Sequence, residues 1–409
     1  MGGSFIEQLW DCRHKPSRRF RRSRRNFAAR ARWIALLSQP FRQLCNAVRH
    51  DKSKIPYFLR FTRHPPTCQH PGFLVSFRRS AHVNMRVLIT GGAGFIGSHL
   101  ADLLLDRGDE VIVIDNLSTG RHENIEHLMG RQSFQFELGS ILNGDLVDHL
   151  ISRVDAVYHL AAAVGVELIV QRPLESLTTN IRGSELVLEK AHKHGTQILV
   201  TSTSEIYGKN TSDRLSEEDD RILGSPLKSR WSYSEAKAID EILAYTYWKE
   251  KGLRTVIVRL FNTVGPRQTG SYGMVIPRFV RQAMRDEPLT VYGDGSQSRC
   301  FCYVGDVVGA MVALMVHPAA AGRVFNIGSS EEVTIHELAE RVIQITGSES
   351  KIRFVAYDEA YEEGFEDMQR RVPDTTRVAQ LVGFKPTVTL DAIISMVAEE
   401  FRKRTPRDL

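Results

Sequence analysis

The sequence is poor in cysteine and shows no cysteine pattern that would bind a metal. Five cysteines occur in 409 residues, and none stands in a C-x-x-C pair. The histidines form no cluster with metal-ligand spacing, so the sequence predicts neither a metal site nor a disulfide framework. Cysteine use of this kind is typical of a reducing compartment, and we expect a cytoplasmic protein.

Long apolar runs are also absent. The run Trp33–Leu37 near the N-terminus has five residues, whereas a helix needs about 20 apolar residues to cross a bilayer. The same segment lacks the apolar core and small-residue cleavage site of a secretory signal. The sequence therefore predicts no membrane-bound part.

Acidic residues are scarce in residues 1–84, which contain 18 Lys and Arg but only 3 Asp and Glu. Residues 85–409 contain 36 basic and 45 acidic residues, so the pI of about 9.0 describes the first segment alone. The body is not expected to bind nucleic acid. An Arg-rich segment suits a transit peptide or a nucleic-acid-binding tail. We favour a disordered extension or a true start at Met85, where a strand begins directly.

Strands and helices alternate along residues 85–265. The strand 86–90 is followed by a glycine-rich turn, a helix to residue 106 and a strand 111–114. Further strands are expected over 154–160, 198–201 and 255–260, and helices over 177–194 and 233–250. This alternation predicts an α/β fold with a Rossmann-type, doubly wound parallel sheet. The looser pattern over 266–409, with helices near 276–286, 306–316, 334–346 and 389–402, predicts a smaller α/β domain that mainly binds substrate.

The glycine-rich turn has the spacing G-x-x-G-x-x-G, with Gly91, Gly94 and Gly97. Glycine allows both the tight turn and a close approach of the backbone to a dinucleotide pyrophosphate at a helix N-terminus. Asp115 ends the next strand, about 20 residues on, as this motif requires. Its carboxylate would bind the adenosine ribose and repel a 2′-phosphate, so NAD is favoured over NADP.

A second constellation has the chemistry of proton transfer. Tyr233 and Lys237 are four residues apart at the start of a predicted helix and share one face. A neighbouring ammonium favours the phenolate and lowers the tyrosine pKa, so that Tyr233 can take a proton from a sugar hydroxyl. Thr203, at the end of a strand, can bind the same hydroxyl. Glu205 can act as a base beside the oxidised carbon or merely begin a turn.

With these motifs, residues 85–400 resemble the extended short-chain dehydrogenase/reductase family of nucleotide-sugar epimerases, dehydratases and decarboxylases. The matching stretches are 115–120, 159–162, 259–267, 291–295 and 371–374. The resemblance implies further NAD-binding residues, with Tyr233 and Lys237 among them: Phe95, Ile96, Asn116, Ser118, Thr119, Gly120, Leu160, Ala161, Ala162, Asn180, Tyr233 and Lys237. It implies substrate contacts at Asn262, Val275, Tyr292, Arg299 and Arg371, with both arginines on the diphosphate. Ser140 departs from the family, which usually has Asp beside the adenine.

Members of this family first form a 4-keto sugar, and the side chains after Thr203 influence its fate. A 4,6-dehydratase resembling the dTDP-glucose enzymes needs an acid where this chain has Ser204. Thr203-Ser204-Glu205 and Arg299-Cys300-Phe301 resemble UDP-glucuronate decarboxylases. The loops 162–166 and 273–277 instead resemble UDP-sugar 4-epimerases.

We favour a UDP-sugar 4-epimerase, with UDP-glucuronate decarboxylase as the alternative and a 4,6-dehydratase after it. A dinucleotide sensor without chemistry is disfavoured because such proteins typically lose the Tyr/Lys pair. The resemblance also implies a homodimer formed through the helices near 178–194 and 233–250.

Overall fold

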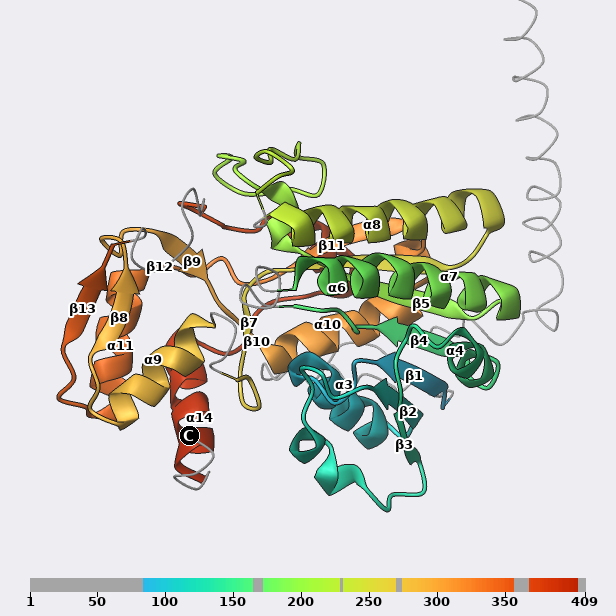
Figure 1. Cartoon of the computed structure of the whole chain (residues 1–409), viewed down its shortest axis with the longest axis horizontal. Helices are drawn as coiled ribbons and strands as arrows, with labels where there is room; N and C mark the ends of the chain where they lie inside the picture. Colours follow the sequence, from blue (N-terminus) through green and yellow to red (C-terminus); the bar gives the residue numbers. More distant parts are fainter. Residues whose placement is uncertain (1–83, 165–171, 229–230, 270–273, 357–367, 404–409) are drawn as a thin grey trace, which may run out of the picture. The chain divides into compact units, whose positions relative to one another are not determined.

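A computed structural model describes residues 84–164, 172–228, 231–269, 274–356 and 368–403. The expected N-terminal extension lies outside the described residues, as do Gly165, Val166 and Gly273 of the two loops that resemble epimerases. Among the described residues, seven parallel strands form one sheet in the order β11-β6-β5-β4-β1-β2-β3 (Figure 1). The strands are β1 (Arg86–Thr90), β2 (Glu110–Asp115), β3 (Phe134–Leu138), β4 (Ala156–His159), β5 (Gln197–Thr203), β6 (Thr255–Leu260) and β11 (Arg323–Ile327). The strand order reverses beside β1, which confirms the predicted doubly wound fold.

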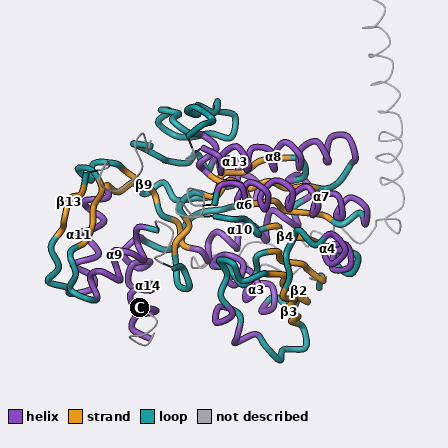
Figure 2. The backbone as a smooth tube through the Cα atoms, in the orientation of Figure 1, coloured by secondary structure: helices purple, strands orange, loops and turns teal. Residues whose placement is uncertain are grey.

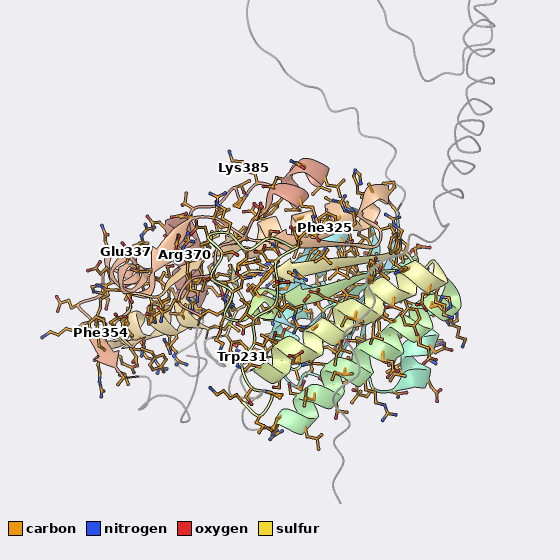
Figure 3. The ribbon with its side chains drawn as sticks, turned by 90° about the horizontal axis from the view of Figure 1, so that it is seen from above. Trp231, Phe325, Glu337, Phe354, Arg370 and Lys385 are labelled. Carbon is orange, nitrogen blue, oxygen red and sulfur yellow. The ribbon has the colours of Figure 1, made fainter. Side chains whose placement is uncertain are left out.

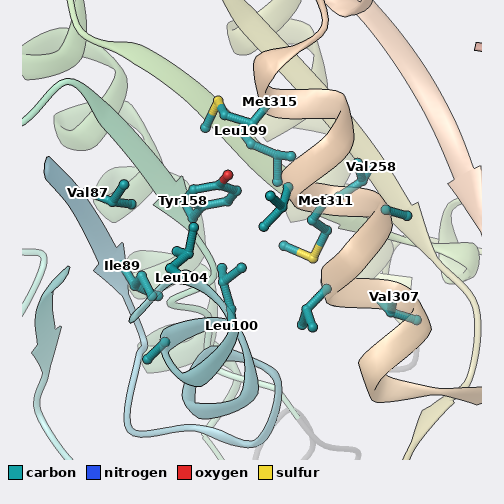
Figure 4. Packing of buried hydrophobic residues seen from close by; sticks show 14 of the residues in the cluster. Val87, Ile89, Leu100, Leu104, Tyr158, Leu199, Val258, Val307, Met311 and Met315 are labelled. Carbon is teal, nitrogen blue, oxygen red and sulfur yellow. The ribbon is translucent and has the colours of Figure 1, made fainter. Parts of the chain in front are cut away.

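The central strands are buried on both faces of the sheet, which explains their unbroken apolar sequences. In β1, Ile89 packs into one core cluster and Leu88 into another on the opposite face. Figure 4 shows the first cluster, where Ile89 and Leu104 lie in the same core as Met311. The helices of this face are α3 (Phe95–Asp106) and α10 (Val304–Val316); those of the other face are α4 (Gly144–Ile151), α7 (Gly183–His194) and α8 (Ser232–Lys251) (Figure 2).

The strand register places the functional motifs at one edge of the sheet. Thr90 at the end of β1 is paired with Ile114 of β2 and with His159 of β4. Because parallel strands present their carboxyl ends at a common edge, the glycine turn, Asp115 and the end of β5 lie together. Ligands of open α/β sheets bind at this kind of edge.

The helix expected over 177–194 is interrupted. The chain forms α6 (Pro173–Leu177), a single wide π-helical segment, η4 (Thr178–Arg182), and then α7. The wide segment contains Asn180, which is fully buried and hydrogen-bonded to the backbone of Ala163. Such local widening is common at functional sites because it re-aims side chains, and helical periodicity in sequence does not reveal it.

The C-terminal part packs around its own core cluster. Its helices are α9 (Val275–Met284), α11 (Ile335–Thr346) and α14 (Leu390–Lys403), and its short strands are β8 (Leu289–Tyr292), β9 (Ser298–Cys300), β12 (Glu332–Thr334) and β13 (Ile352–Val355). Two further strands, β7 (Thr263–Val264) and β10 (Cys302–Tyr303), pair with each other. The chain returns to the large sheet three times after residue 265, through α10, β11 and α13 (Thr376–Val382). Because of these returns, residue 265 does not separate the large sheet from the C-terminal core. The expected assignment of NAD binding to residues before 265 and substrate binding to those after it stays a prediction.

Within the described residues, no helix is both long and apolar enough to span a bilayer. Cys300 and Cys302 are buried and free, and burial raises the pKa of both thiols. They are packed as small apolar side chains in β9 and β10.

Candidate active site

The turn after β1 is built so that only glycine fits at two positions. Gly91 has φ +73°, and a Cβ there would lie 2.8 Å from the Cα of Ala161. A Cβ on Gly97 would lie 2.7 Å from the Cα of Gly92. Among the described residues, no side chain caps the N-terminus of α3, so its first N–H groups are available to an anion. These features fit a dinucleotide pyrophosphate.

Asp115 ties the end of β2 to this turn. Its carboxylate accepts hydrogen bonds from the backbone N–H of Ala93 at 3.0 Å and of Leu117 at 2.8 Å. Burial raises the pKa of Asp115, while these two bonds lower it. Gly120 stands against the same carboxylate, where a Cβ would come within 2.8 Å of Oδ2. Gly120 thus makes room for Asp115 and does not itself line the cavity.

One cavity of about 620 Å³ joins the turn to the C-terminal part. The predicted cofactor residues on its wall are Gly91, Gly94, Phe95, Ile96, Gly97, Asp115, Asn116, Ser118, Thr119, Leu160, Ala161 and Ala162. All predicted catalytic and substrate residues also line it: Thr203, Ser204, Glu205, Tyr233, Lys237, Asn262, Val275, Tyr292, Arg299 and Arg371. Ser140, the departure from the family pattern, lies on the same wall.

Asn180 is not brought to the cavity wall. Its Oδ1 accepts a hydrogen bond from the N–H of Ala163 at 2.7 Å, and its Nδ2 donates to the Ala163 carbonyl at 3.1 Å. Ala163 does line the cavity. Asn180 therefore holds the backbone of the cavity wall after β4 in place and does not itself line the cavity.

Tyr233 and Lys237 lie in the first turns of α8, and Lys237 is buried. The Lys237 ammonium donates to Asp240 Oδ2 at 3.0 Å. Burial, Glu205 and Asp240 together raise the pKa of Tyr233. The pKa of Tyr233 is thus raised and not lowered, because burial, the largest of these causes, disfavours the phenolate. The expected stabilisation of the phenolate by the Lys237 charge stays a prediction.

The end of β5 places Glu205 beside Ser204 and Thr203. Thr203 begins the 3-10 helix η5 (Ser204–Tyr207), with its Oγ1 accepting from the Glu205 N–H at 3.2 Å. Arg371 Nη1 donates to Glu205 Oε1 at 2.7 Å and to Ser204 Oγ at 3.4 Å. The side chains of Arg371 and Glu205 are only 6% and 18% exposed. The family resemblance implied that Arg371 binds a diphosphate, whereas the structure pairs it with a candidate proton-transfer group.

On the substrate side, several predicted residues are fixed by backbone contacts. Arg299 Nη1 donates to the Ser298 carbonyl at 2.8 Å, and Asn262 Nδ2 donates to the Cys300 carbonyl at 2.9 Å. The guanidinium carbon of Arg278 lies over the Tyr292 ring, 4.6 Å from the ring centre. The sequence reading missed Arg278, although it stands three residues after Val275 on one face of α9. It also missed Arg172, Glu175, Arg267, Gln268 and Gln297, whose approach to the cavity depends on tertiary structure.

Comparisons with known proteins agree with this geometry. The model of the NAD dependent epimerase/dehydratase family matches residues 87–328. A UDP-N-acetyl-alpha-D-glucosaminuronate decarboxylase of Bacillus cytotoxicus is 41% identical, over 78% of this chain and 98% of the relative. UDP-glucuronic acid decarboxylase 1 of Xenopus tropicalis is 38% identical, over 78% and 72%.

Solved structures with the same fold include 4-epimerases. The UDP-glucose 4-epimerase of Thermotoga maritima, with UDP-glucose, is 32% identical with a TM-score of 0.71. The UDP-glucuronic acid 4-epimerase of Bacillus cereus, with UDP-glucuronic acid and NAD, is 30% identical with a TM-score of 0.71. Each match covers 78% of this chain and 99% of the solved chain.

Proposed function

Because the chain belongs to the NAD dependent epimerase/dehydratase family, with NAD as its cofactor, we propose that it decarboxylates a UDP-linked uronate through a 4-keto intermediate. The observation that carries this proposal is Glu205, paired with Arg371 beside Tyr233. An epimerase needs proton transfer only at the C4 hydroxyl. A decarboxylase needs a second proton at C5, where CO₂ leaves. Curated relatives that are decarboxylases, 36–41% identical to this chain, support the same choice.

Each group of residues has a separate role in the proposed reaction. The glycine turn and Asp115 would hold NAD, which would serve as hydride acceptor and donor. Tyr233 takes the proton of the C4 hydroxyl as hydride leaves C4, which becomes a ketone. The C5–C6 bond then breaks, CO₂ leaves, and the electron pair is delocalised onto the ketone oxygen. C5 takes up one proton, which enters from solvent through Glu205, and Tyr233 returns its proton as hydride returns to C4.

Arg371 and Arg299 bring positive charge to the same cavity. Within the described residues Arg371 Nε has no hydrogen-bond partner, so it remains a donor for an anionic substrate group. Guanidinium groups suit diphosphate and carboxylate oxygens because they donate two parallel hydrogen bonds. A UDP-uronate presents both kinds of anion.

A 4-epimerase is the second candidate. The sequence favours it through the loop that contains Ala162 and Ala163, and the similar solved structures include 4-epimerases. An epimerase requires only that the 4-keto sugar turn over in the cavity and take back hydride on its other face. Both reactions use the same Tyr233, so the loss of Tyr233 cannot distinguish them, whereas the product can.

The deciding experiment is product analysis with the full chain, NAD, and UDP-glucuronate or UDP-N-acetylglucosaminuronate. We expect a UDP-pentose, or its N-acetylated counterpart, and one equivalent of CO₂, identified by NMR and CO₂ capture. A 4-epimer that keeps its carboxylate would replace decarboxylase with epimerase. UDP-glucose serves as the control, because it has no carboxylate to lose and would be changed by an epimerase or a 4,6-dehydratase but not by a decarboxylase.

We also propose that the enzyme is a homodimer formed through α7 and α8, which pack side by side (Figure 3). On α8, Ile239, Ile242 and Tyr245 recur every three residues and are exposed, Ile242 by 62%. An exposed apolar stripe of this kind is typical of a protein interface. The family resemblance points to the same two helices.

Replacing Ile242 with Glu should convert the dimer to a monomer in sedimentation velocity, since it buries a charge at the centre of the interface. Phe354→Glu is the matched control, because Phe354 is also exposed but lies on β13, in the C-terminal part. A wild-type chain that sediments as a monomer at all concentrations would contradict the dimer.

A further inference from the structure

Lys237 and Asp240 form a buried ion pair inside the active-site helix. The ammonium nitrogen and the carboxylate oxygen are 3.0 Å apart, and the two side chains are 2% and 0% exposed. Removing two charges from water is costly, and the cost is offset only when each finds partners. The pair therefore needs an explanation beyond stability.

A polar chain runs behind this carboxylate. Burial raises the pKa of Asp240 and Ser184 of α7 lowers it, while Asp240 Oδ1 is buried with no hydrogen-bond partner among the described residues. The Ser184 hydroxyl and His159 Nε2 are 2.9 Å apart, and His159 Nδ1 is 2.8 Å from Thr90 Oγ1. Thr90 in turn accepts a hydrogen bond from the Ala161 N–H at 3.1 Å.

The side chains behind Asp240 are buried and uncharged. Thr90, His159 and Ser184 are fully buried, and burial lowers the pKa of His159 to about 3, so its ring is neutral at physiological pH. Both ends of the chain, Lys237 and Ala161, line the active-site cavity. A hydrogen-bonded network of this kind holds its members in one arrangement.

The charges around Tyr233 are balanced in pairs. Glu205 of η5 raises the pKa of Tyr233 and is paired with Arg371. Glu241, next to Asp240 on α8, is bound by Arg259 of β6 at 2.8 and 2.9 Å. Asp240 is paired with Lys237, the cation that the phenolate of Tyr233 would need.

We propose that Asp240 is a positioning residue, which fixes the Lys237 ammonium beside Tyr233 and shares its charge, so that Tyr233 can both take a proton and give it back. This inference rests on the proposed role of Tyr233 as the group that exchanges a proton with the C4 hydroxyl. An unshared ammonium would hold the phenolate too firmly, and Tyr233 would then return its proton poorly in the last step.

The test is Asp240→Asn in the NAD-loaded enzyme, which keeps an oxygen to accept from Lys237 but removes the negative charge. Without the Asp240 charge, the Lys237 ammonium should stabilise the phenolate of Tyr233 more strongly, so that the phenolate forms at a lower pH. We expect the acid limb of kcat/KM for the uronate to move down by about one pH unit. The ultraviolet titration of the Tyr233 phenolate, taken as the difference from the same protein with Tyr233→Phe, should move by the same amount.

Glu241→Gln is the matched control, since it removes the neighbouring buried carboxylate but leaves the Lys237–Asp240 pair intact. It should lower the melting temperature and leave the acid limb in place. If Asp240→Asn does not fold, Ser184→Ala should move the titration in the same direction by less, because the pKa of Asp240 rises without its neighbour.

An unmoved phenolate titration in folded Asp240→Asn, or in Ser184→Ala if that variant replaces it, would overturn the inference, whatever happens to turnover. The titration needs no sugar substrate. A shifted titration in a protein that leaves UDP-uronates unchanged would therefore remove the proposed function and keep the role of Asp240.

Discussion

Replacing Tyr233 with Phe should lower kcat by about 10²- to 10⁴-fold, the usual contribution of a general acid–base group. The change removes one hydroxyl and keeps the ring. Lys237 stays paired with Asp240, and the glycine turn and Asp115 are untouched, so NAD affinity should be unchanged. Steady-state turnover and NAD titration by fluorescence measure the two quantities separately.

Tyr245→Phe provides the control for this variant. Tyr245 lies on the same helix, in the exposed stripe, and does not line the active-site cavity; the change keeps its aromatic ring in the stripe. It should turn over substrate at the wild-type rate. Undiminished activity in Tyr233→Phe would remove the proton-transfer mechanism itself, for the epimerase as well as for the decarboxylase.

Replacing Glu205 with Gln should separate the two candidate reactions. Gln still accepts a hydrogen bond from Arg371, so the fold should tolerate the change. A decarboxylase loses its route for the C5 proton and should slow by about 10²- to 10⁴-fold. An epimerase does not protonate C5, and its turnover should stay within a few-fold.

A neighbouring ion pair supplies the control for Glu205. Arg370 binds Glu332 through two hydrogen bonds of 2.8 and 2.9 Å, one residue before Arg371, and Glu332 does not line the active-site cavity. Glu332→Gln removes the same charge from a more exposed Arg–Glu pair and should leave turnover at the wild-type level. Equal losses in both variants would assign Glu205 a structural task only.

Arg371→Met tests the pair from its other side. It leaves the Glu205 carboxylate without its partner, and breaking a fully buried pair costs about 3–5 kcal/mol. The cost here should be smaller, since Glu205 is 18% exposed and water can reach it. Denaturant unfolding of the variant should show the loss, and adding Glu205→Gln should recover part of it because no unpaired charge remains.

Much of the cofactor half could be predicted because its signals are local. The glycines at 91, 94 and 97, the helix that follows and Asp115 at the end of the next strand are set by spacing within one β-α-β unit. The alternation of apolar strands and helices likewise predicted the sheet. Tyr233 and Lys237 could be matched because four residues make one helical turn.

The tertiary structure alone decided two things: the contacts between residues that are distant in sequence, and the effects of burial on pKa. Glu205 and Arg371 are 166 residues apart and meet only because the chain returns to the large sheet after its C-terminal core. Asn180 shapes the cavity wall from within a π-helical segment rather than from its surface. The sequence by itself indicated which groups could exchange protons. Burial, Glu205 and Asp240 raise the pKa of Tyr233, and only the tertiary structure decided this, because a pKa depends on the surroundings of the group.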